Sequence, residues 1–157
     1  MVTRQLSFGP SAYRIDALVS FPAPTLAMVR SIPLYTSLFC YGDLLRGRDT
    51  EEGVFVVSEV VGRGGYSSFA LLLHPAIDDT LLATVCKGLA EINAVYEAMP
   101  LGDSTILKVA ALPADLPRVE ALIQRGSGDT WIYARLHESP GFMDYVPRTN
   151  EHRADDD

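Results

Sequence analysis

Apolar and polar residues alternate along several short segments of the chain, and this period-2 pattern predicts β-strands that bury one face. The first segment covers residues 13–21, where every odd-numbered residue from Tyr13 to Phe21 is apolar or aromatic. Pro22 and Pro24 end it. Four further strands are predicted over residues 54–61, 66–73, 105–112 and 130–137.

Spacings of three and four between apolar residues predict helices elsewhere. The longest runs from Pro75 to Met99, with Asp78 and Asp79 in its first turn and Pro100 closing it. A second helix is capped by Asp115 and stops near Gly126. A short helix is predicted from Thr25 to Ile32.

Residues 34–45 fit two patterns. The aromatic residues and Thr36 favour a strand, whereas Leu34, Leu38, Tyr41 and Leu45 also form a helical stripe. We favour a strand that ends before Gly42. The polar residues 46–53 are predicted to form a surface loop.

A glycine cluster, residues 62–65, separates two of the predicted strands, which favours a β-hairpin around it. A phosphate-binding loop needs a helix directly after the glycines. The segment that follows is strand-like, so the hairpin is the preferred interpretation.

These elements predict an α+β protein. The simplest arrangement is a two-layer sandwich, in which helices pack on one face of a mixed or mainly antiparallel sheet of about five to six strands. Residues 1–147 are predicted to form a single domain, and residues 148–157 a disordered acidic tail.

The charge balance narrows the classes of partner. The chain has 13 Lys and Arg against 20 Asp and Glu, a net charge of −7. Because nucleic-acid binding needs a concentrated basic face, we expect no nucleic-acid partner. No stretch approaches the ~20 apolar residues of a membrane span, and the N-terminus has no signal-peptide pattern. We therefore expect a cytoplasmic protein without a membrane partner, in which Cys40 and Cys86 are reduced and buried.

Two histidines suggest the strongest chemical hypothesis. His74 and His137 each end a predicted strand, and Asp78 follows His74. If the two strands were neighbours, these side chains would converge as a metal site or an acid–base pair. The first-turn position already explains Asp78, and nothing in the sequence shows convergence. No catalytic, cofactor-binding or metal-binding residue is therefore assigned, and no cofactor is expected.

Surplus aromatic and methionine side chains indicate a binding surface, because such residues are enriched at protein interfaces. These side chains lie in two segments of the chain. The alternative is that they belong to the core or form a lid over one edge of the sheet. The candidate interface residues are Tyr35, Phe39, Tyr41, Phe142, Met143 and Tyr145.

The sequence thus favours a non-catalytic accessory, assembly or regulatory module that acts through protein–protein contacts, with a homodimer as the expected assembly. The alternative is a small enzyme or small-ligand-binding domain with a pocket at the strand ends near His74 and His137.

Overall fold

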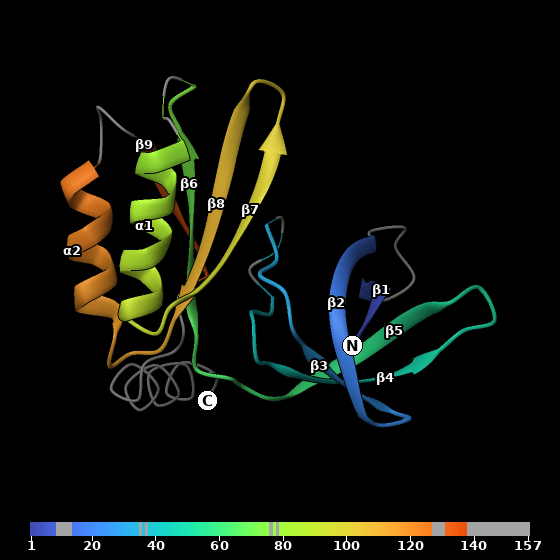
Figure 1. Cartoon of the computed structure of the whole chain (residues 1–157). Helices are drawn as coiled ribbons and strands as arrows, with labels where there is room; N and C mark the ends of the chain where they lie inside the picture. The colour runs from blue at the N-terminus through green and yellow to red at the C-terminus, as the bar shows by residue number, and fades with distance from the viewer. Residues whose placement is uncertain are drawn as a thin grey trace, which may run out of the picture.

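A computed structural model describes residues 1–8, 14–34, 36, 38–75, 77, 79–126 and 131–137. It contains a β-barrel and a separate sheet covered by two helices (Figure 1). Among the described residues, no helix combines the length and the apolar character needed to cross a bilayer.

The first half of the chain forms a closed barrel with the strand order β1-β2-β3-β4-β5. Neighbours pair antiparallel except β1 and β5, which close the barrel in parallel. Its strands are β1 (Val2–Phe8), β2 (Arg14–Ala23), β3 (Leu26–Val29), β4 (Leu44–Asp49) and β5 (Val54–Gly62).

Inward-facing side chains fill the barrel. In β2, Ile15, Ala17 and Val19 are buried, as the alternation of that segment predicts. Phe39 and Phe55 are fully buried and belong to the same core. The barrel interior is therefore a packed apolar core.

The second half forms a four-stranded sheet with the order β7-β8-β6-β9. Its neighbouring strands all pair antiparallel. The helices α1 (Asp79–Glu91) and α2 (Leu116–Gly126) cover the face of this sheet that points away from the barrel (Figure 1). The strands are β6 (Ser67–Leu73), β7 (Val95–Leu101), β8 (Ser104–Ala111) and β9 (Trp131–His137).

A second apolar core lies between this sheet and its helices. Leu89 of α1 and Val109 of β8 are both fully buried in it, which confirms the predicted packing of these two residues. Trp131 also joins this core, and its indole N–H donates to the Ile123 carbonyl at 2.8 Å.

The predicted two-layer α+β sandwich is wrong, because five strands close into a barrel of their own. No strand is predicted over β1 (Val2–Phe8), which closes the barrel against β5, and two further local predictions in the barrel are wrong. The predicted helix over residues 25–32 contains β3, whose Ala27 and Val29 are buried with a period of two. The predicted loop over residues 46–53 contains most of β4. A four-residue strand is too short to distinguish the two periods.

The long predicted helix is half correct. It ends at Glu91, and residues 95–101 form β7 instead. Asn93 adopts a left-handed conformation with φ 62°. The N–H of Ala94 then donates to the Leu89 carbonyl at 3.0 Å, and the N–H of Asn93 to the Ala90 carbonyl at 3.0 Å. This is a Schellman cap, which stops a helix whatever apolar pattern follows.

The predicted hairpin around residues 62–65 is also wrong. β5 belongs to the barrel and β6 to the other sheet, so the glycine cluster is the connection between them. At Gly64 an added Cβ would lie 2.6 Å from the Gly42 carbonyl carbon. The connection therefore requires glycine here because two backbone segments touch.

Candidate functional site

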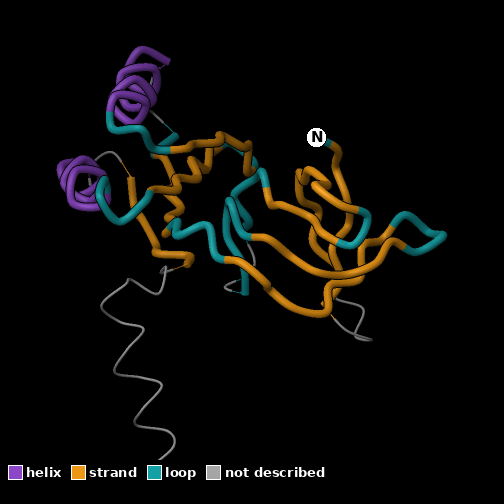
Figure 2. The backbone as a smooth tube through the Cα atoms, turned by 90° about the horizontal axis from the view of Figure 1, so that it is seen from below, coloured by secondary structure: helices purple, strands orange, loops and turns teal. Residues whose placement is uncertain are grey.

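A cleft of about 710 Å³ lies between the barrel and the sheet. In Figures 1 and 2 the segment that follows β3 occupies the space between these two parts. The cleft is lined by Thr3 and residues 14–18 of the barrel, residues 31–34 of this segment, and Met99 and Lys108 of the sheet. Its size is typical of pockets that bind a ligand.

An ion pair on the sheet holds one wall of the cleft in place. Lys108 Nζ lies 2.8 Å from Glu97 Oε2, and the two residues are paired across β7 and β8. Lys108 Nζ donates to the Ile32 carbonyl at 2.9 Å, and the Ile32 N–H donates to Glu97 Oε1 at 3.1 Å. Both backbone groups of Ile32 are therefore bonded to side chains of the sheet.

Because these bonds hold Ile32 on the sheet, the antiparallel pairing of β3 with β2 does not continue as far as Ile32. Val19 pairs with Val29 and Ser20 with Met28. Three further steps of that antiparallel register would pair Asp16 with Ile32. Because Glu97 and Lys108 hold Ile32, the Asp16 backbone is left without that neighbour.

The direction of the Asp16 backbone follows from Leu18. The Leu18 N–H donates to Ser31 Oγ at 2.9 Å, and its carbonyl accepts from the Arg30 N–H at 2.7 Å. Both groups thus point away from β1. Residues two apart in a strand point their backbone groups the same way, so the Asp16 N–H and C=O face the cleft.

The two charged side chains along this edge, Arg14 and Asp16, differ in whether they form an ion pair. The Arg14 guanidinium lies 3.4 Å from Glu52 Oε2, which compensates its charge. Asp16 is exposed, and among the described residues its carboxylate makes no ion pair. The open edge therefore presents a negative side chain beside backbone groups that pair with no described strand on this side.

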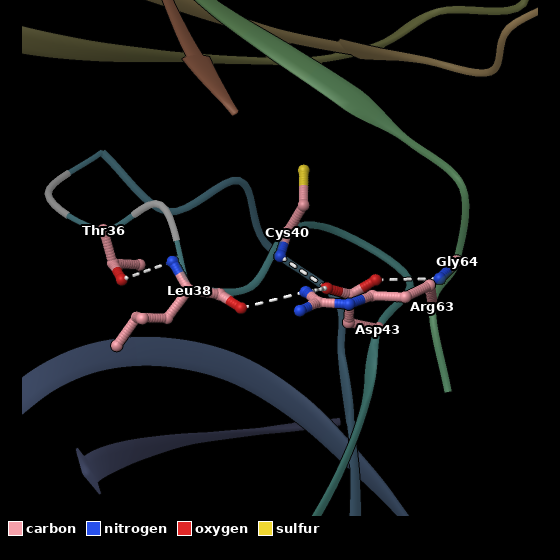
Figure 3. Close-up of polar contacts among 6 residues, drawn as sticks. All are labelled: Thr36, Leu38, Cys40, Asp43, Arg63 and Gly64. Atoms are coloured by element: carbon pink, nitrogen blue, oxygen red, sulfur yellow. Dashed lines mark hydrogen bonds and ion pairs between the residues drawn. The ribbon is translucent and has the colours of Figure 1, made fainter. Parts of the chain in front are cut away.

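A second polar cluster fixes the junction of the barrel and the sheet (Figure 3). The side chain of Asp43 is 2% exposed. It accepts from the N–H of Cys40 at 2.9 Å, the N–H of Gly64 at 2.8 Å, and the guanidinium of Arg63 at 2.9 Å. Arg63 also donates to the Leu38 carbonyl at 2.9 Å. These bonds fasten the glycine connection to the loop before β4.

The structure separates the two histidines of the chemical hypothesis. His74 follows the last residue of β6, whereas the backbone of His137 pairs with Ser68 near the start of β6. Six residue steps along the strand separate their backbone positions by about 20 Å, which is too far for both residues to bind one metal ion. Asp78 lies outside the described residues. The described residues contain no group of three metal-ligating side chains.

A smaller pocket does lie beside His74. Its volume is about 180 Å³, and Ser104, Trp131 and Ile132 contribute to its wall. Ile132 is 62% exposed. The pocket of the alternative hypothesis was expected near both histidines, whereas this one is lined by His74 and by residues at the opposite end of β6 from His137.

The candidate interface residues are divided between core, partly buried positions and undescribed segments. Phe39 is fully buried and stacks on Phe8 with ring centroids 5.2 Å apart. Tyr41 is half-buried and meets Tyr66 edge to face at 5.0 Å. Tyr35, Phe142, Met143 and Tyr145 lie outside the described residues. A binding role for Phe39 finds no support, because its ring packs inside the barrel.

Sequence reasoning missed the residues that shape the cleft. Lys108 is a charged residue within an apolar strand, which is a signal of a special role. Its partner Glu97 lies in the segment that the sequence predicts to be helical. The β7–β8 hairpin had to be recognised before the pair could be inferred.

No family model and no curated protein matches this chain. A solved structure with a similar fold is a crystal structure of a hypothetical protein from Neisseria gonorrhoeae. The TM-score is 0.59 at 11% identity, over 88% of this chain and 97% of that chain. At this identity the similarity shows a shared fold.

Proposed function

We propose that this protein is a non-catalytic binding module that holds a segment of a partner protein in the cleft between the barrel and the sheet. The opened ladder at Asp16 and Ile32 carries the proposal. Unpaired backbone donors and acceptors at a strand edge are a ready template for another chain.

The lining of the cleft supports the same conclusion. Pro33, Leu34 and Met99 give it apolar surface. Asp16 and the backbone edge give it a few fixed polar groups. Ligand sites combine these two features, since apolar area supplies affinity and polar groups supply orientation.

The compartment and the assembly belong to the proposal. A cytoplasmic location is supported by Cys40 and Cys86, which are free cysteines. Disulfide bonds are more frequent in exported proteins. A homodimer remains the expected assembly. The net charge of −7 supports a partner other than nucleic acid.

Selection from a displayed library of random 12-residue peptides tests the proposal. We expect enriched peptides to bind the full chain with a micromolar Kd. Met99→Glu places a charge in the cleft and should weaken binding at least tenfold. Leu101→Glu is the matched control, because Leu101 is 47% exposed on the same strand and does not line the cleft.

The proposal fails if no selected peptide binds the purified protein, or if both variants lose binding equally. Circular dichroism of each variant establishes that the fold is intact.

The pocket beside His74 supports a second candidate, a site for a small ligand. At about 180 Å³ it is smaller than the ~300–1,000 Å³ typical of drug-sized ligands. A library of small fragments screened by NMR distinguishes the two. Binding that shifts the signals of His74 and is lost in His74→Ala would favour the second candidate.

A further inference from the structure

We infer that the occupant of the cleft is an extended peptide that adds to the edge of β2 as an extra strand, with a basic residue opposite Asp16. This inference rests on the proposed function and specifies how the partner is held.

The backbone geometry defines where such a strand would lie. The Asp16 N–H and C=O face the cleft, as the bonds of Leu18 establish. The same alternation turns the backbone groups of Arg14 in that direction. At Leu18 the N–H is already bonded to Ser31, so the added strand ends there. The open edge thus offers a short stretch, residues 14–17.

The position of Ile32 explains why this edge stays open. In a continuous ladder its N–H and C=O would bond the Asp16 backbone. Here the Glu97 carboxylate takes the place of the Asp16 carbonyl, and the Lys108 ammonium takes the place of the Asp16 N–H. Because the ion pair satisfies both backbone groups of Ile32, an incoming peptide would compete with none of the described strands at this edge.

The faces of β2 predict the side chains of the peptide. Asp16 points outward, while Ile15 and Ala17 point into the barrel core. A residue directly opposite Asp16 would share its outer face, where an opposite charge is favourable. The residues on either side of it would share the face of Ile15 and Ala17. The expected motif is therefore apolar–basic–apolar.

Methylation of single peptide amides tests the strand addition. The probe is a library-selected peptide that carries this motif, and each of its amides is N-methylated in turn. Methylation of amides that face β2 should weaken binding about tenfold, the equivalent of one lost hydrogen bond. The alternate amides point away and should tolerate methylation, so every peptide carries its own control.

Charge variants test the basic residue. Asp16→Asn keeps the backbone and the size of the side chain, and should weaken binding about two- to fivefold, as for an exposed ion pair. Replacing the basic residue of the peptide should give a similar loss that Asp16→Asn abolishes. Glu51→Gln is the matched control, because it changes the net charge equally and Glu51 is an exposed residue outside the cleft.

The outcomes separate this inference from the proposed function. Absence of any peptide that binds the cleft overturns the proposed function. A peptide that binds the cleft but is equally sensitive to methylation at all positions, or at none, overturns only the strand addition. A dimer whose formation buries the Asp16 edge, seen as loss of dimer in Asp16→Pro by sedimentation, makes a second copy the occupant and overturns the peptide inference.

Discussion

At the scale of single residues, Asp43 holds together the junction between the barrel and the sheet. Asp43 is a buried carboxylate with hydrogen bonds to two backbone N–H groups and to Arg63. Such bonds to an ionised acceptor are among the stronger ones in proteins. The strand predicted to end before Gly42 is wrong, because the described residues from Leu34 to Tyr41 form no strand. The local pattern indicates none of the partners of Asp43, because Gly64 is 21 residues away.

The same loop contains the buried thiol of Cys40. Burial raises the pKa of Cys40 from 9.0 to about 11. Cys86 is only half-buried, and burial raises its pKa as well. At pH 8 we expect iodoacetamide to modify Cys86 in the native protein and to leave Cys40 intact, as measured by mass spectrometry. Both thiols should react after unfolding in guanidinium chloride.

Two variants check this expectation. Cys86→Ser should leave the native protein unmodified at pH 8, and rapid alkylation of Cys40 in that variant would contradict the buried position. The raised pKa also has a consequence for stability. An unfolded thiol ionises near 9.0 while the folded one stays protonated to about 11, so unfolding free energy should fall as the pH rises through this range. Cys40→Ala should reduce that slope.

At the scale of the element, the sequence predicted strands where apolar residues alternate or form a run over seven or more residues. β2, β6, β8 and β9 lie close to their expected bounds. α2 also begins at Leu116, directly after its predicted cap Asp115. In these elements local pattern and tertiary packing agree, which is why a reading of the sequence finds them.

The sequence did not predict the barrel, because two of its strands are stabilised by pairing with neighbouring strands rather than indicated by a local pattern. β3 has four residues and β4 carries Arg46, Arg48 and Asp49. Neither has a local pattern that excludes a helix or a loop. Gly47 in β4 is required because an added Cβ would lie 2.3 Å from the Val56 carbonyl oxygen. Such a close approach exists only once β4 pairs with β5.

The interior of the second core provides a test of the helix packing. Leu89 is fully buried in α1, so Leu89→Ala should lower the free energy of unfolding by about 2–5 kcal/mol. Leu81→Ala on the same helix is the control, because Leu81 is 41% exposed. Urea denaturation measures both. A loss below ~1 kcal/mol for Leu89→Ala would contradict its burial in this core.

At the scale of the whole molecule, the cleft could not be predicted from local patterns. It exists because Ile32 bonds to Glu97 and Lys108, which lie 65 and 76 residues further along the chain. Lys108 is notable as a charged residue in an apolar strand, but nothing close to it in the sequence indicates Glu97 or Ile32 as its partner. Only the packing of the sheet against the barrel segment brings them together.

The predicted homodimer also belongs to this scale. It was expected through residues 34–41 or 142–145. Leu38 is 52% exposed and lies in the first of these segments. We expect Leu38→Asp to shift the protein toward monomer in sedimentation at micromolar concentration, with Leu101→Asp as a control of similar exposure. A wild-type protein that sediments as a monomer of 17.1 kDa would contradict the homodimer.

The order in which the chain is synthesised determines when the ion pair of Glu97 and Lys108 can bind Ile32. All five barrel strands lie within residues 2–62, so they are synthesised before Glu97 and Lys108. Domains and subdomains near the N-terminus generally fold first. Before Glu97 and Lys108 are present, the β2–β3 register would allow the backbone of Ile32 to pair with that of Asp16. We therefore expect the edge of β2 to stay open only once the β7–β8 hairpin holds Ile32, so that this strand edge is exposed only after most of the protein has been translated.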